Sequence, residues 1–278
     1  MLVIEGNSAL RQCIPNTMAS AAGEPTLYLK LYPYLEQAEQ WLVDNITGQE
    51  VLNVIATMKD IDTPRYLAAK VITCHALSLA VPSLDLVLTA NGFGIVNTGN
   101  IAPASKDRVE RLMASLVDGR DANLGSLLFR LHGFSGWVDT PQAAFFGSTL
   151  FPDFSICRKL LIKTDHWNNY CSLRSKLIAI ENDLAEKFFS QELMASLRSE
   201  VLRRTFHLPL RSKVIDSIRS IEVMLLSDVK VQQQSYFDIV NIIRENETVF
   251  PEWHNSATAE LYTPPVFRNE KESHGYWF

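Results

Sequence analysis

Three short segments contain residue types that could carry out catalysis: Gly133–Gly136, Cys74–His75 and Asp165–His166. Ser135 lies in Gly-Phe-Ser-Gly, one residue short of the Gly-x-Ser-x-Gly turn that presents a hydrolase nucleophile. Cys74–His75 lies in an apolar stretch, and adjacent helix positions point about 100° apart, so the two side chains diverge. Asp165–His166 could orient a base, but Trp-Asn-Asn follows it, which is typical of a loop or helix cap. These spacings favour a turn, a buried pair and a cap over a catalytic site.

The residue motifs that usually bind metals or cofactors are also absent from this sequence. There is no His-Glu-x-x-His for zinc and no Gly-x-x-x-x-Gly-Lys loop for phosphate. Gly92–Gly94 lacks the third glycine of a dinucleotide loop. Glu39 and Glu181 could build a dimetal site only beside Glu-x-x-His, which is absent. We therefore predict no cofactor, no metal and no enzymatic activity.

Composition narrows the class of protein further. The chain has 278 residues, of which 47% are apolar, so it can bury a large core and is not disordered. Its formal charge of −5 disfavours a general nucleic-acid coat. The sequence shows no secretory signal and no apolar run of about 20 residues that could span a membrane. We expect a cytoplasmic protein that makes no membrane contact.

Helical periodicity dominates the chain and predicts a mainly α fold. An irregular arm is expected over residues 1–30, where no period is sustained. Asn91-Gly92, between two β-prone runs, predicts a short hairpin over residues 84–97. A second hairpin is expected at the C-terminus, over residues 266–278. Helices are expected around residues 35–46, 66–80, 105–117, 124–131, 173–188, 190–201, 214–225 and 236–243.

The sequence also indicates an internal duplication. A shift of 142 positions aligns residues 35–55 with residues 177–197 without a gap. The identical pairs are Leu35/Leu177, Glu39/Glu181, Leu42/Leu184, Gln49/Gln191 and Glu50/Glu192. A shift of 116 then aligns Trp137/Trp253, Ala143/Ala259, Phe145/Leu261, Phe146/Tyr262, Leu150/Val266 and Phe151/Phe267. We predict two pseudo-repeated helical units packed together, over residues 31–151 and 152–278. Chance similarity between amphipathic helices is the alternative.

Three surface features are candidate partner contacts. The first is the hairpin tip, with Asn91, Gly92 and Phe93. The second is a basic cluster with Arg203, Arg204 and Arg211, which could touch an acidic partner or a phosphate backbone. The third is the aromatic C-terminus, with Trp277 and Phe278, whose exposure would favour docking on a neighbour. A solvated helix end is the alternative interpretation of the basic cluster.

Several segments resemble an uncharacterised family found in prophages of gut Bacteroidales. They are Leu84-Asp-Leu-Val-Leu-Thr-Ala-Asn-Gly-Phe-Gly-Ile-Val96, Ala102-Pro-Ala-Ser-Lys-Asp-Arg-Val109 and, at the C-terminus, Val266-Phe-Arg-Asn269 with Gly275-Tyr-Trp-Phe278. The resemblance covers most of the chain. It implies a domain of unknown function encoded among capsid and tail genes, loosely similar to phage head–tail connector and adaptor proteins. Its motifs are structural, so no functional residue is carried over.

The resemblance implies a non-enzymatic structural protein of a phage or prophage. Its partners would be other phage structural proteins, such as the portal or tail, or further copies of itself. Any DNA contact would be secondary, and the protein would stay in the cytoplasm until assembled in a virion. Two alternatives remain open from the residues alone: a helical small-molecule-binding or regulatory protein, and an enzyme of an unrecognised class.

Overall fold

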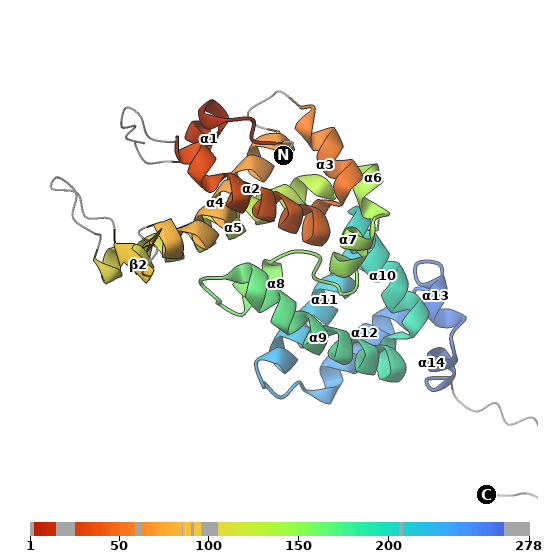
Figure 1. Cartoon of the computed structure of the whole chain (residues 1–278). Helices are drawn as coiled ribbons and strands as arrows, with labels where there is room; N and C mark the ends of the chain where they lie inside the picture. The colour runs from red at the N-terminus through yellow and green to blue at the C-terminus, as the bar shows by residue number, and fades with distance from the viewer. Residues whose placement is uncertain are drawn as a thin grey trace, which may run out of the picture.

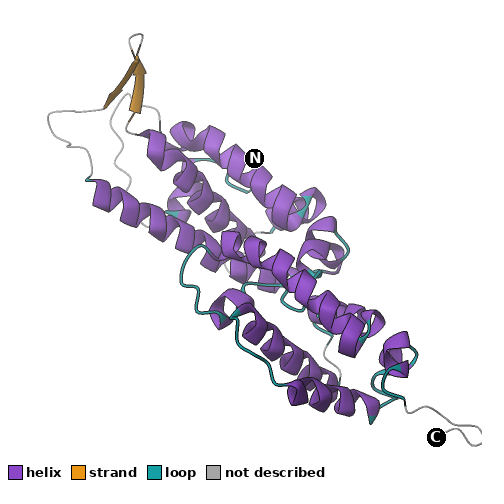
Figure 2. Cartoon of the chain, turned by 90° about the horizontal axis from the view of Figure 1, so that it is seen from below, coloured by secondary structure: helices purple, strands orange, loops and turns teal. Residues whose placement is uncertain are grey.

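The computed structural model describes residues 3–14, 26–58, 63–84, 86–89, 92–95, 105–205 and 208–263. Within these residues the chain is mainly α-helical, as the periodicity predicts. Figure 1 shows the first half, up to residue 151, above the second half, and Figure 2 shows that the helices form one elongated body. None of the described helices is both long and apolar enough to cross a membrane.

The first half contains seven α-helices, one π-helical turn and one strand pair within the described residues. In chain order they are α1 (Asn7–Cys13), α2 (Leu27–Leu42), η1 (Val43–Thr47, a π-helix), α3 (Gln49–Ala56), α4 (Pro64–Leu84), β1 (Leu86–Thr89), β2 (Gly92–Ile95), α5 (Lys106–Leu131), α6 (Ser135–Val138) and α7 (Pro141–Phe146).

The second half has a similar order of elements without a strand pair among its described residues. They are α8 (Ser155–Lys159), α9 (His166–Leu184), η2 (Ala185–Phe189, a π-helix), α10 (Gln191–Arg203), α11 (Pro209–Leu226), α12 (Gln233–Arg244), α13 (Pro251–His254) and α14 (Ala257–Glu260).

The strands β1 and β2 pair antiparallel between α4 and α5. Leu86 lies opposite Ile95, and Thr89 lies opposite Gly92. Figure 2 shows the pair beyond the ends of the neighbouring helices. The expected second hairpin, together with Asn91, Trp277 and Phe278, lies outside the described residues.

The N-terminal region differs from the expected irregular arm over residues 1–30. Residues 7–13 form α1, which buries Leu10 and Cys13, a spacing too short to stand out as a period. α2 begins at Leu27, well before Pro33, because the Thr26 hydroxyl caps the N–H of Leu29. Pro33 therefore lies inside a helix instead of preceding one.

A further difference concerns α5, which is one continuous helix from Lys106 to Leu131. The sequence indicates two shorter helices here because few apolar residues lie between them. Arg120 and Asp121 occupy the inward face at that point, and they are buried as a polar pair. The helix therefore continues across the residues between the two helices that the sequence predicts.

Two segments that lie 142 residues apart follow the same backbone course. α2, η1 and α3 form a helix, a π-helical turn and a second helix, and α9, η2 and α10 do the same. Each π-turn ends at a residue with positive φ. Gly48 has φ 71° and ψ 161°, and Ser190 has φ 63° and ψ 152°. This backbone region is almost restricted to glycine, so its recurrence at aligned positions is a specific match.

The helix pairs that close the two halves also match, at the shift of 116. The indole N–H of Trp137 in α6 donates to the carbonyl of Ile46 at 2.6 Å, and that of Trp253 in α13 donates to Phe188 at 2.8 Å. Both acceptors lie in the π-turns. The next short helix is capped by a hydroxyl in each half, from Thr140 to the N–H of Ala143 and from Ser256 to that of Ala259. Each closing pair therefore anchors to its own π-turn.

The core has two clusters that do not divide at residue 151. The first contains the buried apolar residues of α1 to α7 and reaches into α8 and α9, where it includes Trp167 and Tyr170. The second lies among α9 to α14 and is centred on η2 and α10. Because the first cluster takes side chains from both halves, the halves share apolar burial at their junction.

Candidate functional site

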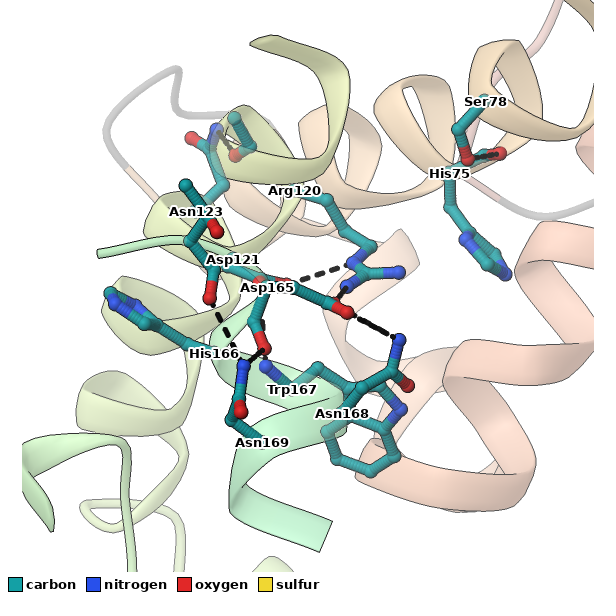
Figure 3. A network of polar contacts seen from close by, with 12 residues as sticks. His75, Ser78, Arg120, Asp121, Asn123, Asp165, His166, Trp167, Asn168 and Asn169 are labelled. Carbon is teal, nitrogen blue, oxygen red and sulfur yellow. Dashed lines mark hydrogen bonds and ion pairs between the residues drawn. The ribbon is translucent and has the colours of Figure 1, made fainter. Parts of the chain in front are cut away.

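The most connected polar site in the described residues lies where α5 meets the start of α9 (Figure 3). The Arg120 guanidinium donates to Asp121 at 2.8 Å and to Asp165 at 3.1 Å. Asp165 occupies the N-cap position of α9 with φ 51°, a left-handed conformation that aspartate tolerates. The arginine side chain is 7% exposed and that of Asp121 is 2% exposed, so both charges are buried as a pair.

Further hydrogen bonds satisfy the remaining acceptors of this network. Asp121 accepts the backbone N–H of Trp167 at 3.3 Å, and Asp165 accepts the Asn168 amide at 2.8 Å. Arg120 also lies 5.8 Å from the ring centroid of Trp41 in α2. The network therefore ties α2, α5 and α9 together, and its geometry is that of a structural joint between the halves.

The histidines near this network do not complete a catalytic group. His166 bonds through Nε2 to the carbonyl of Ile162 at 3.0 Å, and in Figure 3 its ring points away from Asp165. His75 packs on Trp41, with ring centroids 4.5 Å apart. Burial lowers the pKa of His75 to about 4 and raises the pKa of the Cys74 thiol to about 11. Near neutral pH both are uncharged, which makes Cys74 a weak nucleophile.

A cleft of about 930 Å³ lies beside the network, between α5, α8 and the start of α4. Aromatic walls and charged side chains line it together. Phe129 is 60% exposed there, and the Arg204 guanidinium lies over its ring, 3.9 Å from the ring centroid. Its lining residues include Tyr66, Asp121, Arg130, Asp153, Phe154, Arg158 and His166. Such a cleft could hold a small polar aromatic molecule. No group of three His, Cys, Asp or Glu side chains suited to a metal ion occurs in the described part of the chain.

The basic cluster expected from the sequence is divided among different contacts. Arg203 is exposed and pairs with Asp139 at 2.6 Å, whereas Arg204 stacks on Phe129. Arg211 is different, because its side chain is only 7% exposed and lies inside the second half. Its guanidinium contacts Glu200, Ser196, Glu252 and the Val249 carbonyl. The structure therefore leaves Arg203 and Arg204, but not Arg211, with atoms that an outside partner can reach.

Glu181 and Tyr170, both on α9, hold the backbone of Leu150–Phe151. A Glu181 oxygen accepts the N–H of Leu150 at 2.6 Å, and the Tyr170 hydroxyl donates to the carbonyl of Phe151 at 2.8 Å. Leu150 and Phe151 are fully buried. We call this arrangement the second backbone clamp. It fixes the chain at the point where it enters the second half.

Glu39 and Tyr28, both on α2, hold Val3–Ile4 in the same way. A Glu39 oxygen accepts the N–H of Val3 at 3.1 Å, and the Tyr28 hydroxyl donates to the carbonyl of Ile4 at 3.4 Å. Val3 is 2% exposed and Ile4 is 1% exposed. This is the first backbone clamp. In both clamps an α-helix follows the held dipeptide, α1 in the first half and α8 in the second.

Sequence reasoning singled out the two glutamates but missed the two tyrosines. Tyr28 and Tyr170 lie 142 positions apart, the same shift that aligns Glu39 with Glu181. Extending the alignment toward the N-terminus would have found this pair. The held dipeptides are harder to find, because Val3 and Leu150 are 147 positions apart and share only apolar character.

Glu181 also belongs to a buried charge cluster in the second half. Its other oxygen lies 2.8 Å from Nε of Arg198. Burial raises the pKa of Glu181 to about 7, against the opposing effects of the Leu150 N–H and of Arg198. Glu222 on α11 is fully buried, and burial together with the nearby Glu181 raises its pKa well above the usual range. Burial therefore favours the neutral, protonated form of Glu222 over its charged form.

Part of the chain matches a known family model. Residues 20–144 match the model of a family of unknown function, DUF6712. The matched segment contains all helices from α2 to α6 and ends within α7, so it includes the first π-turn and Trp137. The expectation that the chain contains a domain of unknown function is confirmed. No curated protein and no solved structure matches the chain.

Proposed function

We propose that the protein is a non-enzymatic structural protein built from two copies of one helical unit, and that it acts through protein–protein contacts. The observation that carries the proposal is the pair of backbone clamps, because each unit uses a glutamate and a tyrosine of one helix to hold a buried dipeptide by its backbone. A head–tail connector or adaptor of a phage or prophage is the role that this design and the family resemblance favour.

Support for two copies comes from contacts that recur at aligned positions. The π-turns, the positive-φ residues, the two tryptophan bonds and the two hydroxyl caps occur in the same order in both halves. Chance similarity of amphipathic helices would explain aligned apolar residues, but it would not align hydrogen bonds that join distant segments. In these terms unit one ends and unit two begins at Leu150–Phe151, the dipeptide that the second backbone clamp holds.

Support for a role without catalysis comes from the bonds of the candidate groups. Asp165 is bonded to Arg120 and Asn168, and His166 to a backbone carbonyl. Cys74 and His75 are uncharged and partly buried against other helices. Side chains that hold the fold together in this way contribute to a rigid body, which suits a protein that connects others.

A groove between α3 and α6 offers a contact surface on unit one. It encloses about 500 Å³ and is lined by Glu50, Val51, Val54, Gly133, Phe134 and Gly136. Val54 is 53% exposed there. In unit two the aligned positions carry Ser196, Phe250 and Glu252, and Arg211 joins the serine to the glutamate. The aligned positions of unit two are therefore joined by polar contacts, whereas unit one presents an apolar groove.

The partners of this protein would be other phage structural proteins, such as the portal or tail, or further copies of the same chain. The hairpin with Gly92 and Phe93, the groove at Val54 and the exposed Arg203 are candidate contacts. DNA contact through Arg203 and Arg204 would be secondary, because the chain carries a net charge of −5. The protein would remain in the cytoplasm until it is assembled in a virion.

Co-expression with a portal protein encoded by the same genome tests this proposal. We expect a stoichiometric complex on size-exclusion chromatography. Val54→Asp places a charge in the groove and should weaken the complex, whereas Asn53→Asp adds the same charge on the neighbouring exposed position and should not. Deletion of residues 86–95 should weaken it as well. A complex that resists Val54→Asp and the deletion equally would exclude these surfaces, and a portal that never binds the chain would contradict the connector role.

A small-molecule-binding protein is the second candidate, favoured by the cleft beside α5. Its volume of about 930 Å³ and its mix of aromatic and charged walls suit a ligand such as a nucleotide or an aromatic acid. Thermal melting with a panel of such compounds distinguishes the two candidates. A melting shift that disappears in Phe129→Ser would favour the binding protein.

A further inference from the structure

Leu150–Phe151 belong to both units at once. They follow α7, the last helix of unit one, and they are also the dipeptide that the second backbone clamp holds. The trailing segment of one unit is thus the leading segment of the next. In this chain, a helical unit holds the end of the unit that precedes it.

Val266–Phe267 follow α14 as Leu150–Phe151 follow α7. The shift of 116 that aligns Trp137 with Trp253 also aligns Leu150 with Val266 and Phe151 with Phe267. Residues 266 and 267 lie outside the described residues, so their equivalence rests on the sequence and on the matched helices that precede them. Unit two therefore carries a trailing segment of the kind that a clamp holds.

We infer that Val266–Phe267 of one copy of this chain enter the first backbone clamp of a second copy, in place of that copy's Val3–Ile4. The inference rests on the two-unit architecture proposed above. The clamp contacts one backbone N–H through Glu39 and one carbonyl through Tyr28, and any apolar dipeptide presents both. The second clamp already accepts a phenylalanine at its second position, since it holds Phe151.

The arrangement of the chain explains why the acceptor is a second copy. Figure 1 shows α1 and α2 in the upper part of the body and α14, which is the last described helix, at its lower right. The trailing segment of unit two therefore starts far from the first clamp of its own chain. An exchange between copies is head to tail, and contacts of this type close into rings or extend into filaments.

The exchange is close to balanced, because the incoming dipeptide makes the same two backbone bonds as the one it replaces. Val3–Ile4 is attached to its own clamp through the chain, which gives it a high effective concentration. Removal of Val3–Ile4 should therefore allow the trailing segment to bind the first backbone clamp at a measurable affinity. A high local concentration of copies, as in an assembling particle, would favour the exchanged form.

Peptide binding to the full chain and to a chain that lacks residues 1–5 tests the inference. The probe is a fluorescent peptide with the sequence of residues 261–271, followed by polarisation. We expect it to bind the shortened chain at least about tenfold more tightly than the full chain. A Phe267→Asp peptide should not bind, and an Asn269→Asp peptide, which carries the same added charge, should bind like the parent. No binding to a shortened chain with native circular dichroism would overturn the inference.

Sedimentation of the intact chain gives a second test that does not depend on the deletion. The average mass of the wild-type chain should rise with concentration, that of Phe267→Asp should not, and Asn269→Asp should behave as wild type. A wild-type mass that stays constant, or one that rises equally in Phe267→Asp, would overturn the inference. The portal complex reports separately on the proposed function, since it would still form if only the exchange between copies were wrong.

Discussion

Ser190 adopts in unit two the backbone conformation that Gly48 adopts in unit one, with φ and ψ differing by less than 10° (63° and 152° against 71° and 161°). Each residue ends a π-helical turn and starts the next helix. Serine is strained in this region, where glycine is nearly the only residue that fits. The Ser190 hydroxyl compensates in part, because it accepts the N–H of Leu193 at 3.1 Å.

This relationship predicts opposite effects of two substitutions at one position. Ser190→Gly releases the backbone strain, and glycine at an N-cap position loses little of the capping free energy. The substitution should therefore stabilise the protein by about 1 kcal/mol. Ser190→Ala keeps the strain and loses the cap, so it should destabilise by about 1 kcal/mol. Urea unfolding measures both. Gly48→Ala is the matched variant of unit one and should cost about 1–2 kcal/mol. Equal effects of Ser190→Gly and Ser190→Ala would contradict the strain.

The two clamp tyrosines should differ in their contribution to stability. Tyr170→Phe leaves the buried carbonyl of Phe151 without its donor and should cost about 1–3 kcal/mol. Tyr28→Phe removes a longer and partly exposed bond to Ile4 and should cost about 0.5 kcal/mol. Denaturant midpoints of the two variants provide the measurement. A larger loss of stability from Tyr28→Phe than from Tyr170→Phe would contradict this prediction.

The Glu181–Glu222 pair predicts that stability falls as the pH rises. Burial raises the pKa of Glu181 to about 7 and that of Glu222 well above its usual range, so the folded state keeps protons that the unfolded chain releases. The stabilisation is complete below about pH 4.3, the unfolded value, and is lost as the pH rises through the folded pKa values. Each proton contributes a slope of up to about 1.4 kcal/mol per pH unit.

Glu222→Gln keeps the shape of the side chain and removes its titration. We expect the variant to be more stable than the wild type at pH 8 and to show a flatter decline from pH 5 to pH 8. Glu186→Gln, on the exposed side of η2, should keep the wild-type slope. Unfolding curves across this pH range measure the slope of stability against pH. An unchanged slope in Glu222→Gln would contradict the raised pKa of Glu222.

Arg211 and Arg203 should respond very differently to truncation. Arg211→Ala removes the partner of Glu200 and Glu252 from a site where the arginine is 7% exposed, and it should cost about 3 kcal/mol. Arg203→Ala breaks an exposed pair with Asp139 and should cost less than about 1 kcal/mol. Thermal unfolding of the two variants compares them. Similar small losses would place Arg211 at the surface instead.

The sequence predicts well those features that repeat along the chain. The helical class follows from the apolar period, whereas Gly92, expected in the turn with Asn91, is paired with Thr89 in the strand ladder. The aligned glutamates and tryptophans are visible in the sequence because their types are identical. Their partners are not, because Ile46 and Phe188 accept hydrogen bonds through backbone carbonyls, which every residue has.

Long-range pairing is the part that local patterns miss. Arg211 belongs to a basic run in the sequence, which predicts a surface contact for a partner. Its acidic partner Glu252 is 41 positions away, and the pairing makes Arg211 a buried structural residue instead. Arg120, in the middle of α5, is paired with Asp165 at the N-cap of α9, 45 positions away. The π-turns insert one extra residue per turn, which an apolar period of 3.6 residues does not reveal.

The most direct test of the structural role is quantitative mass spectrometry of particles purified from the producing cells. The account predicts that the chain is present in the particles at a fixed number of copies relative to the portal. It also predicts that particles made with Val54→Asp contain less of the chain than particles made with Asn53→Asp. Complete, infectious particles that contain none of this chain would contradict the account.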